Sequence, residues 1–379
     1  MEKETICVHS GTYRDGITGG INTPIFTSSA TSYLDRDKAP YPRYFNTANQ
    51  EAVLKKLCDL EGAEAGVLFS SGMAAMSTAI LAFAGAGDHV VLMDELYGGT
   101  HSFATDDFRR MGISHAFAAT EAEAVCRAVN IDTKVIVIES PTNPLLGVID
   151  IMKVAEFAKS KGITTIIDNT FASPINQNPI HLGIDIVVHS GTKYLGGHSD
   201  LCCGAVLASK EKADSVRVLA RHLGGSLNAQ DCYLLERSLK TLSLRVERQT
   251  ANALKVAEFL AACKEVTRVN YPGLPYFPGF DIARRQMSGF GAMLSFEVDP
   301  GQKDPEAFIR NLRLIKPAVS LGGVETTITS PSVTSHATMS AAERERIGIR
   351  KTLFRLSVGI EHERDIISDL KAALKGDTD

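Results

Sequence analysis

The sequence has no long run of basic residues, and its charges nearly balance, with a formal net charge of −4 over 379 residues. This balance argues against a surface for nucleic acid or anionic membranes, so small molecules are the expected partners. Long apolar stretches are also lacking, which argues against a membrane span. The first residues, Met1 to Thr5, lack the apolar core of a secretory signal, and a cytoplasmic protein is therefore predicted.

Cysteine is sparse as well. Seven cysteines are scattered along the chain, and only Cys202 and Cys203 are adjacent. This odd, dispersed set predicts neither a disulfide framework nor a paired zinc motif, so buried free thiols are expected. His189, His198 and Asp200 could be drawn as metal ligands, but they share one short glycine-rich segment without the helical spacing that brings ligands together. No metal is therefore predicted.

The sequence does contain a regular alternation of short apolar runs and helical patterns, from about residue 60 to about residue 210. With 44% hydrophobic residues, the chain can bury a large core and is expected to form at least two domains. The alternation predicts an α/β fold in which helices cover both faces of a mostly parallel sheet. The expected strands are 67–69, 89–93, 134–139, 164–167 and 184–188, and the expected helices are 73–83, 121–129 and 151–161.

The two ends of the chain differ from this central part. Residues 1–48 are rich in Gly, Pro, Thr and aromatic residues with little periodicity, which predicts an extended arm that lies against another surface. Residues 49–243 are the predicted large domain. An amphipathic stretch at 244–262 and a Pro- and Gly-rich break at 271–279 then lead into a smaller C-terminal α/β domain, residues 244–379. The strands expected in it are 292–298 and 353–358, and its last helix is 363–374.

Lys193 comes just after the predicted strand 184–188 and is preceded by two hydroxyl groups, those of Ser190 and Thr192. A lysine amine in this place can condense with the aldehyde of pyridoxal phosphate (PLP), while the hydroxyls hold the phosphate. Further upstream, the turn at 70–72 opens a predicted helix and offers backbone N–H groups and the helix dipole to an anion. The same turn is also an ordinary N-cap.

Two further strands end in polar side chains. Asp168 follows the strand 164–167 and could keep a pyridine nitrogen protonated; alternatively, it caps a helix or loop. Asn143 follows the strand 134–139 in a proline-bounded loop that could equally be a simple turn. Ligands of an open parallel sheet bind outside the carboxyl ends of its strands, so the placement of these residues on one edge favours a single cofactor site.

The Lys193 segment also fits the Ser-x-x-Lys pattern of serine acyl-transfer enzymes. Those enzymes need companion Ser-Asp-Asn and Lys-Thr-Gly motifs, and this chain contains neither. Acyl transfer is therefore disfavoured, and pyridoxal phosphate is the predicted cofactor.

A set of short motifs runs along the chain: Tyr41-Pro42-Arg43, then residues 70–75 (Ser-Ser-Gly-Met-Ala-Ala), 97–100 (Tyr-Gly-Gly-Thr), 140–144 (Ser-Pro-Thr-Asn-Pro), 168–171 (Asp-Asn-Thr-Phe), 189–200, 320–325 and 355–359. In these motifs the sequence resembles the PLP enzymes of cysteine and methionine metabolism, the cystathionine γ-synthase and γ-lyase family, over nearly its whole length. The resemblance implies fold type I, the aspartate aminotransferase-like fold, with a large domain and a smaller C-terminal domain.

The resemblance also implies roles for individual residues. Lys193 would form the internal aldimine with the cofactor and later move the α and β protons. Asp168 would pair with the pyridinium nitrogen, and Tyr97 would stack on the ring and assist proton transfer. The planar fork of Arg355 would grip the substrate α-carboxylate, aided by Ser320.

Other contacts implied by the resemblance hold the cofactor. The phosphate would be bound by the backbone amides of Gly72 and Met73 and by the hydroxyls of Ser190 and Thr192, and Asn143 would bond the ring hydroxyl and also face the substrate. In this family, Tyr41 and Arg43 reach the phosphate of a neighbouring subunit. The implied active unit is a homodimer, usually within a tetramer, which gives the arm its surface.

Some positions depart from the pattern of family members that use cystathionine. Pro40 stands where an acidic residue is typical, and Ser102 stands where an arginine is typical. The loss of these charges should weaken binding of a doubly charged γ substituent and favours a small or uncharged one. Glu325 is typical of the cystathionine enzymes, whereas Gly99 replaces the cysteine typical of methionine γ-lyases.

The predicted reaction is a PLP-dependent γ-elimination, in which a carbon–sulfur lyase converts a sulfur amino acid such as L-methionine or cystathionine to a 2-oxo acid, ammonia and a thiol. A γ-replacement synthase, of the cystathionine γ-synthase or O-acylhomoserine sulfhydrylase type, shares the early steps and is the alternative. A regulatory protein that binds PLP with little turnover is an alternative of another class. The intact set of Tyr97, Asp168, Lys193 and Arg355 argues against it.

Overall fold

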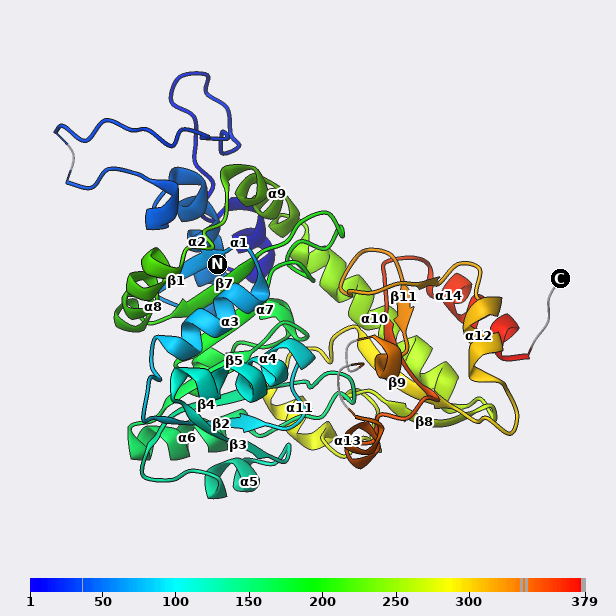
Figure 1. Cartoon of the computed structure of the whole chain (residues 1–379). Helices are drawn as coiled ribbons and strands as arrows, with labels where there is room; N and C mark the ends of the chain where they lie inside the picture. The colour runs from blue at the N-terminus through cyan, green and yellow to red at the C-terminus, as the bar shows by residue number, and fades with distance from the viewer. Residues whose placement is uncertain (36, 335–336, 338–339, 376–379) are drawn as a thin grey trace.

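The computed structural model describes residues 1–35, 37–334, 337 and 340–375, and this part of the chain is built around two β-sheets (Figure 1). The larger sheet has seven strands in the order β1-β7-β6-β5-β4-β2-β3. Because β7 runs antiparallel to both β1 and β6, all the other strands point the same way. The predicted mostly parallel sheet is confirmed. Its strands are β1 (Ala65–Phe69), β2 (His89–Met93), β3 (Ser114–Ala118), β4 (Thr133–Glu139), β5 (Thr164–Asp168), β6 (Ile186–Ser190) and β7 (Gly204–Ala208).

The inner strands of this sheet are apolar along their length because helices pack over them. Every residue of β2 and of β7 is buried. Such continuous apolar runs are typical of parallel strands that are covered on both faces. The helices of this part of the chain are α2 (Ala48–Glu61), α3 (Gly72–Leu81), α4 (Gly98–Ser102), α5 (Ala122–Arg127), α6 (Ile151–Lys161), α7 (Ser173–Asn176) and α8 (Lys210–Leu223).

Local hydrogen bonds decide where the elements begin and end. The helix α6 spans the predicted residues 151–161, since the Asp150 carboxylate accepts the Lys153 N–H at its start and Gly162 turns left-handed at its end. Strand β6, in contrast, begins two residues later than the predicted 184–188. The carboxylate of Asp185 accepts hydrogen bonds from the N–H and the hydroxyl of Thr165, which keeps Asp185 out of the strand.

The first part of the predicted arm is helical rather than extended. Helix α1 (Lys3–His9) packs against α2 and against the long helix α10 (Leu242–Ala261), and it buries Cys7 completely. The rest of the arm runs out from the body of the molecule as an irregular loop (Figure 1) and returns at a short 3-10 turn, Pro42–Tyr44. The predicted division of the chain at residues 48 and 243 stays a prediction.

The smaller sheet has five strands in the order β10-β11-β12-β9-β8. The predicted strands 292–298 and 353–358 correspond to β9 and β12, and the predicted last helix corresponds to α14. Among the residues that the structure describes, no helix is long and apolar enough to cross a membrane. The remaining elements are α9 (Ala229–Leu239), β8 (Val266–Asn270), α11 (Phe280–Gln286), β9 (Met293–Val298), α12 (Pro305–Asn311), β10 (Lys316–Pro317), β11 (Thr327–Thr329), α13 (Ala341–Arg346), β12 (Leu353–Ser357) and α14 (Glu363–Lys375).

Candidate active site

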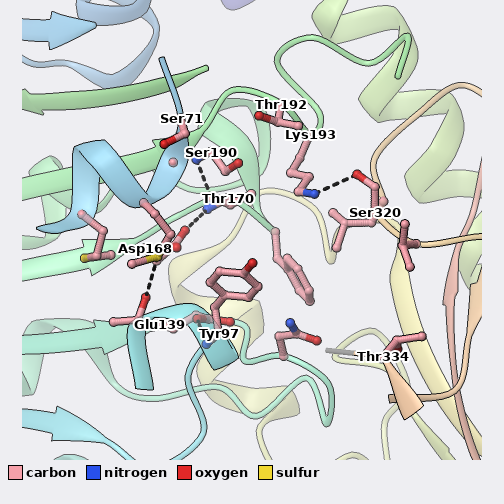
Figure 2. A pocket seen from close by; sticks show the side chains of 18 of the residues that line it. Ser71, Tyr97, Glu139, Asp168, Thr170, Ser190, Thr192, Lys193, Ser320 and Thr334 are labelled. Carbon is pink, nitrogen blue, oxygen red and sulfur yellow. Dashed lines mark hydrogen bonds between the residues drawn. The ribbon is translucent and has the colours of Figure 1, made fainter. Parts of the chain in front are cut away.

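A cavity of about 510 Å³ lies at the carboxyl ends of β1, β4, β5 and β6 and extends to β12 of the smaller sheet. This is the edge at which ligands of an open parallel sheet bind. Most of the predicted residues line the cavity, and Figure 2 shows several of them around it. They are Gly72, Met73, Tyr97, Asn143, Asp168, Ser190, Thr192, Lys193, Ser320 and Arg355.

The N-terminus of α3 opens into this cavity. The Ser71 hydroxyl accepts the Ala74 N–H at 3.1 Å, so the turn is an N-cap as well as a cavity wall. The N–H groups of Gly72 and Met73 precede the first backbone bond of the helix and are available to a ligand. A Cβ on Gly72 would lie 2.8 Å from the Ser190 Cβ, so only glycine lets these two segments approach this closely.

Lys193 lies in the tight turn that follows β6. Its backbone N–H donates to the Ser190 carbonyl at 3.2 Å, and its Nζ donates to the Ser320 hydroxyl at 2.7 Å (Figure 2). Burial, followed by the nearby positive charge of Arg355, lowers the pKa of Lys193. A larger fraction of neutral amine, the form that attacks a carbonyl carbon, is therefore present than for an exposed lysine.

The hydroxyl of Thr192, the second one predicted to bind the phosphate, is hydrogen-bonded to the backbone of Cys203. The Thr192 hydroxyl accepts the Cys203 N–H at 3.1 Å and donates to the Cys203 carbonyl at 3.3 Å. A phosphate would have to take over the donated hydrogen bond. The role of Thr192 in holding the phosphate stays a prediction.

Asp168 ends β5 and is held by the loop that follows. Its carboxylate accepts the Thr170 N–H at 3.0 Å, and the Thr170 hydroxyl in turn accepts the Ser190 N–H at 2.8 Å. Burial raises the pKa of Asp168, because desolvation disfavours its charged form. A cation placed against this carboxylate, such as a protonated ring nitrogen, would offset that penalty.

Arg355 lies in the middle of β12, almost completely buried, and reaches across to the larger sheet. Its Nη1 donates to the Asn143 side-chain oxygen at 2.8 Å, and its Nη2 donates to the Ser320 carbonyl at 3.2 Å. Burial lowers the pKa of Arg355 to about 10, and its Nε has no hydrogen-bond partner among the described residues. A guanidinium held in this way suits a carboxylate ligand.

Tyr97 precedes α4 and leaves about half of its side chain exposed at the cavity. Its backbone N–H donates to Glu139 Oε2 at 2.9 Å. A Cβ on Gly99 would lie 2.6 Å from a ring carbon of Tyr97, so this placement of the ring leaves no room for a cysteine at that position.

Glu139 itself lines the cavity and was not among the residues predicted from the sequence. It ends β4 just as Asp168 ends β5, and that position could have identified it.

Tyr41 and Arg43 do not line the cavity of their own chain. The Arg43 guanidinium donates to the Arg221 carbonyl at 2.8 Å and lies over the ring of Tyr44, while Tyr41 is partly exposed beside it. Their predicted contact with the phosphate of a neighbouring subunit stays a prediction.

The polar groups of the cavity fit pyridoxal phosphate. Free amides at a helix start suit the phosphate, an amine of lowered pKa suits the aldehyde, and a buried carboxylate suits the ring nitrogen. Within the described ranges, no group of three or more His, Cys, Asp or Glu residues could hold a metal ion. Fold and cavity together define a PLP enzyme of fold type I.

Comparison with known proteins gives the family. Residues 4–375 match the family model described as "Cys/Met metabolism PLP-dependent enzyme", and the chain belongs to this family. It is 42% identical over 379 residues to the cystathionine gamma-lyase of Bacillus subtilis (strain 168), covering 99% of this chain and 100% of that protein. It is also 42% identical over 376 residues to the cystathionine beta-lyase of Lactococcus lactis subsp. cremoris (strain MG1363), covering 98% of each.

A solved structure of similar fold is that of cystathionine gamma synthase from Xanthomonas oryzae pv. oryzae, with a TM-score of 0.95, 37% identity and coverage of 99% of this chain and 98% of that one. The predicted family, fold class and cofactor are thus confirmed. The protein is a PLP-dependent carbon–sulfur lyase or γ-replacement enzyme that acts on a small amino-acid substrate. The regulatory alternative is set aside.

Proposed function

We propose that this enzyme catalyses γ-elimination from a sulfur amino acid whose γ substituent carries no charge. L-Methionine is the model substrate, and 2-oxobutanoate, ammonia and methanethiol are the products. The observation that carries the proposal is the distribution of charge in the cavity. Among the described residues that line it, the charged side chains are those of Glu139, Asp168, Lys193 and Arg355. Asp168, Lys193 and Arg355 have proposed roles toward the cofactor or the substrate α-carboxylate, and the Glu139 carboxyl accepts the Tyr97 N–H.

The wall next to Ser320 is uncharged. It is formed by Val319, Leu321, Val333 and Thr334, and both valines are more than two-thirds exposed. Such a surface suits a thioether and offers no counter-charge to a distal amine or carboxylate. Ser102, which takes the place of an arginine, lies outside the cavity lining.

The proposed roles of the catalytic residues follow from these positions. PLP supplies the electron sink for the negative charge that develops at the substrate Cα. The Lys193 amine takes the proton from Cα and delivers it further along the substrate, and its lowered pKa favours the basic form. Asp168 keeps the ring nitrogen protonated, Tyr97 stacks on the ring, and Arg355 holds the α-carboxylate.

The remaining proposed contacts hold the cofactor and substrate in place. The amides of Gly72 and Met73 with the hydroxyls of Ser190 and Thr192 bind the phosphate, Asn143 bonds the ring hydroxyl, and Ser320 and Asn143 support the α-carboxylate. These groups belong to the helix, strand end and loops at the carboxyl edge of the larger sheet, except for Ser320, which lies between β10 and β11 of the smaller sheet. Substrate binding therefore bridges the two sheets.

We also propose a homo-oligomer in which Tyr41 and Arg43 complete the phosphate site of a second copy, with a dimer as the active unit within a tetramer. Exposed apolar side chains on the arm support an interface there, since Ile17 is 95% exposed and Ile21 is 78% exposed. A cytoplasmic location fits the seven cysteines, all of which are free.

The test is the release of 2-oxobutanoate from L-methionine by the purified, PLP-loaded protein without added thiol. We expect kcat/KM for L-methionine to exceed that for L-cystathionine by about tenfold or more, because the uncharged wall discriminates against a doubly charged substituent. Pyruvate is measured in the same samples, since it reports β-elimination. A preference for cystathionine contradicts the proposal, and turnover of an O-acylhomoserine only when a thiol is supplied identifies a γ-replacement enzyme instead.

A further inference from the structure

Glu139 is a buried carboxyl group in the cavity that none of the proposed roles uses. It is the last residue of β4, it is only 4% exposed, and it lines the cavity together with Asp168. The two residues are partners in the ladder between β4 and β5. Paired residues of neighbouring parallel strands point to the same side of the sheet, so the two carboxyl groups share one face.

The Glu139 carboxyl joins two loops that carry proposed active-site groups. Its Oε2 accepts the Tyr97 N–H at 2.9 Å, and Figure 2 shows Glu139 beside Tyr97. The backbone amide of Asn143 also faces this carboxyl closely enough to lower its pKa. Asn143 in turn accepts the hydrogen bond from Arg355. One side chain is therefore connected both to the ring-stacking residue and to the guanidinium proposed to hold the substrate carboxylate.

The charges around Glu139 are of both signs. The carboxylates of Asp168 and Glu95 act on it from the neighbouring strand ends, and Glu139 in turn acts on the Arg355 guanidinium. Burial first, and then Asp168, raises the pKa of Glu139, whereas the backbone amides of Tyr97 and Asn143 lower it. As the pH falls, Glu139 therefore becomes protonated at a higher pH than an exposed glutamate does. The protonated carboxyl is a weaker hydrogen-bond acceptor.

We propose that Glu139 is a positioning residue, which fixes the stacking ring of Tyr97 and the Asn143–Arg355 contact together by holding the backbone of both loops. An unpaired buried N–H is costly, so loss of this carboxyl forces the two loops to move. Cofactor binding and substrate binding then weaken together. Among the described residues, Glu139 forms no hydrogen bond with Arg355 or with the side chains proposed to bind the phosphate, so its effect is indirect.

The first test is Glu139→Leu, which fills the space and removes the carboxyl group. We expect the dissociation constant of PLP and the KM of the amino-acid substrate each to rise about tenfold, and the visible circular dichroism of the bound cofactor to weaken because the ring is no longer fixed. The matched control is Glu297→Leu, a glutamate of similar burial on β9 that lies outside the cavity. It should lower thermal stability without changing cofactor affinity or KM.

A second variant covers the case in which the leucine protein does not fold. Glu139→Gln keeps the shape and one acceptor oxygen but cannot ionise, so we expect about a threefold rise in both constants. On acidification, cofactor affinity should also fall less in this variant than in the wild-type protein, because Glu139 no longer titrates. The proposal is overturned if the variants keep both constants and the pH dependence of the wild type, or if only thermal stability changes, as in Glu297→Leu.

Discussion

At the scale of single residues, several residues that line the cavity could be predicted because ligand-binding residues of a parallel sheet follow the carboxyl ends of its strands. Lys193, Asp168 and Asn143 were predicted in this way, and all three line it. Glu139 obeys the same rule but was missed, because the sequence reads as a strand that continues through it, and the polar residues were sought beyond that strand. The last residue of a predicted strand is therefore as informative as the residues that follow it.

One prediction at this scale concerns the geometry of Arg355. Arg355→Lys keeps the positive charge but replaces a planar fork that bonds Asn143 and Ser320 by a single ammonium. Loss of hydrogen bonds to a charged group typically costs about 1.5–3 kcal/mol, so KM should rise roughly 10- to 100-fold. Steady-state kinetics measure this, with PLP affinity as the control that should stay unchanged. An unaltered KM would remove Arg355 from the proposed substrate site.

At the scale of elements, amphipathic helices with clear ends were the most predictable. Helix α6 was predicted to the residue from its apolar spacing, and in the structure Asp150 caps its start and Gly162 ends it. Strands β7 and β8 were not predicted: β7 is made largely of Gly and Ala, which have weak strand propensity, and β8 exposes part of its length at the edge of its sheet. The pairing of such strands is decided by contacts distant in sequence.

The start of α3 gives a prediction for an element. Gly72→Ala would place a Cβ 2.8 Å from the Ser190 Cβ and push the helix start away from the turn after β6. Overpacking of this kind typically costs about 1–3 kcal/mol, so the dissociation constant of PLP should rise at least about fivefold. Gly85→Ala is the matched control, because the nearest atom to its Cβ, Asp88 Oδ2, would be 4.0 Å away. Equal PLP affinity of both variants would argue against a phosphate at this helix start.

At the scale of the whole molecule, the arm carries apolar surface that the single chain leaves open. Replacing Ile17 and Ile21 together by aspartate should reduce the molecular mass measured by light scattering to that of a smaller species. PLP affinity should fall with it, because Tyr41 and Arg43 would no longer reach a second copy. Ile131→Asp, at a side chain that is 93% exposed in the large-sheet part of the chain, is the control. An unchanged mass would place any interface elsewhere.

The reversed strand β7 has a consequence for how the lysine is presented. The loop 191–203 that carries Lys193 leaves β6 at Ser190 and enters β7 at Gly204, and these two residues are paired in the ladder. Both ends of the loop are therefore fixed side by side. The entropic cost of closing the loop falls on folding of the chain, not on binding of the cofactor. The two ends of this loop are in place before PLP binds, so capture of the vitamin-derived aldehyde should need no movement of the backbone at Ser190 or Gly204.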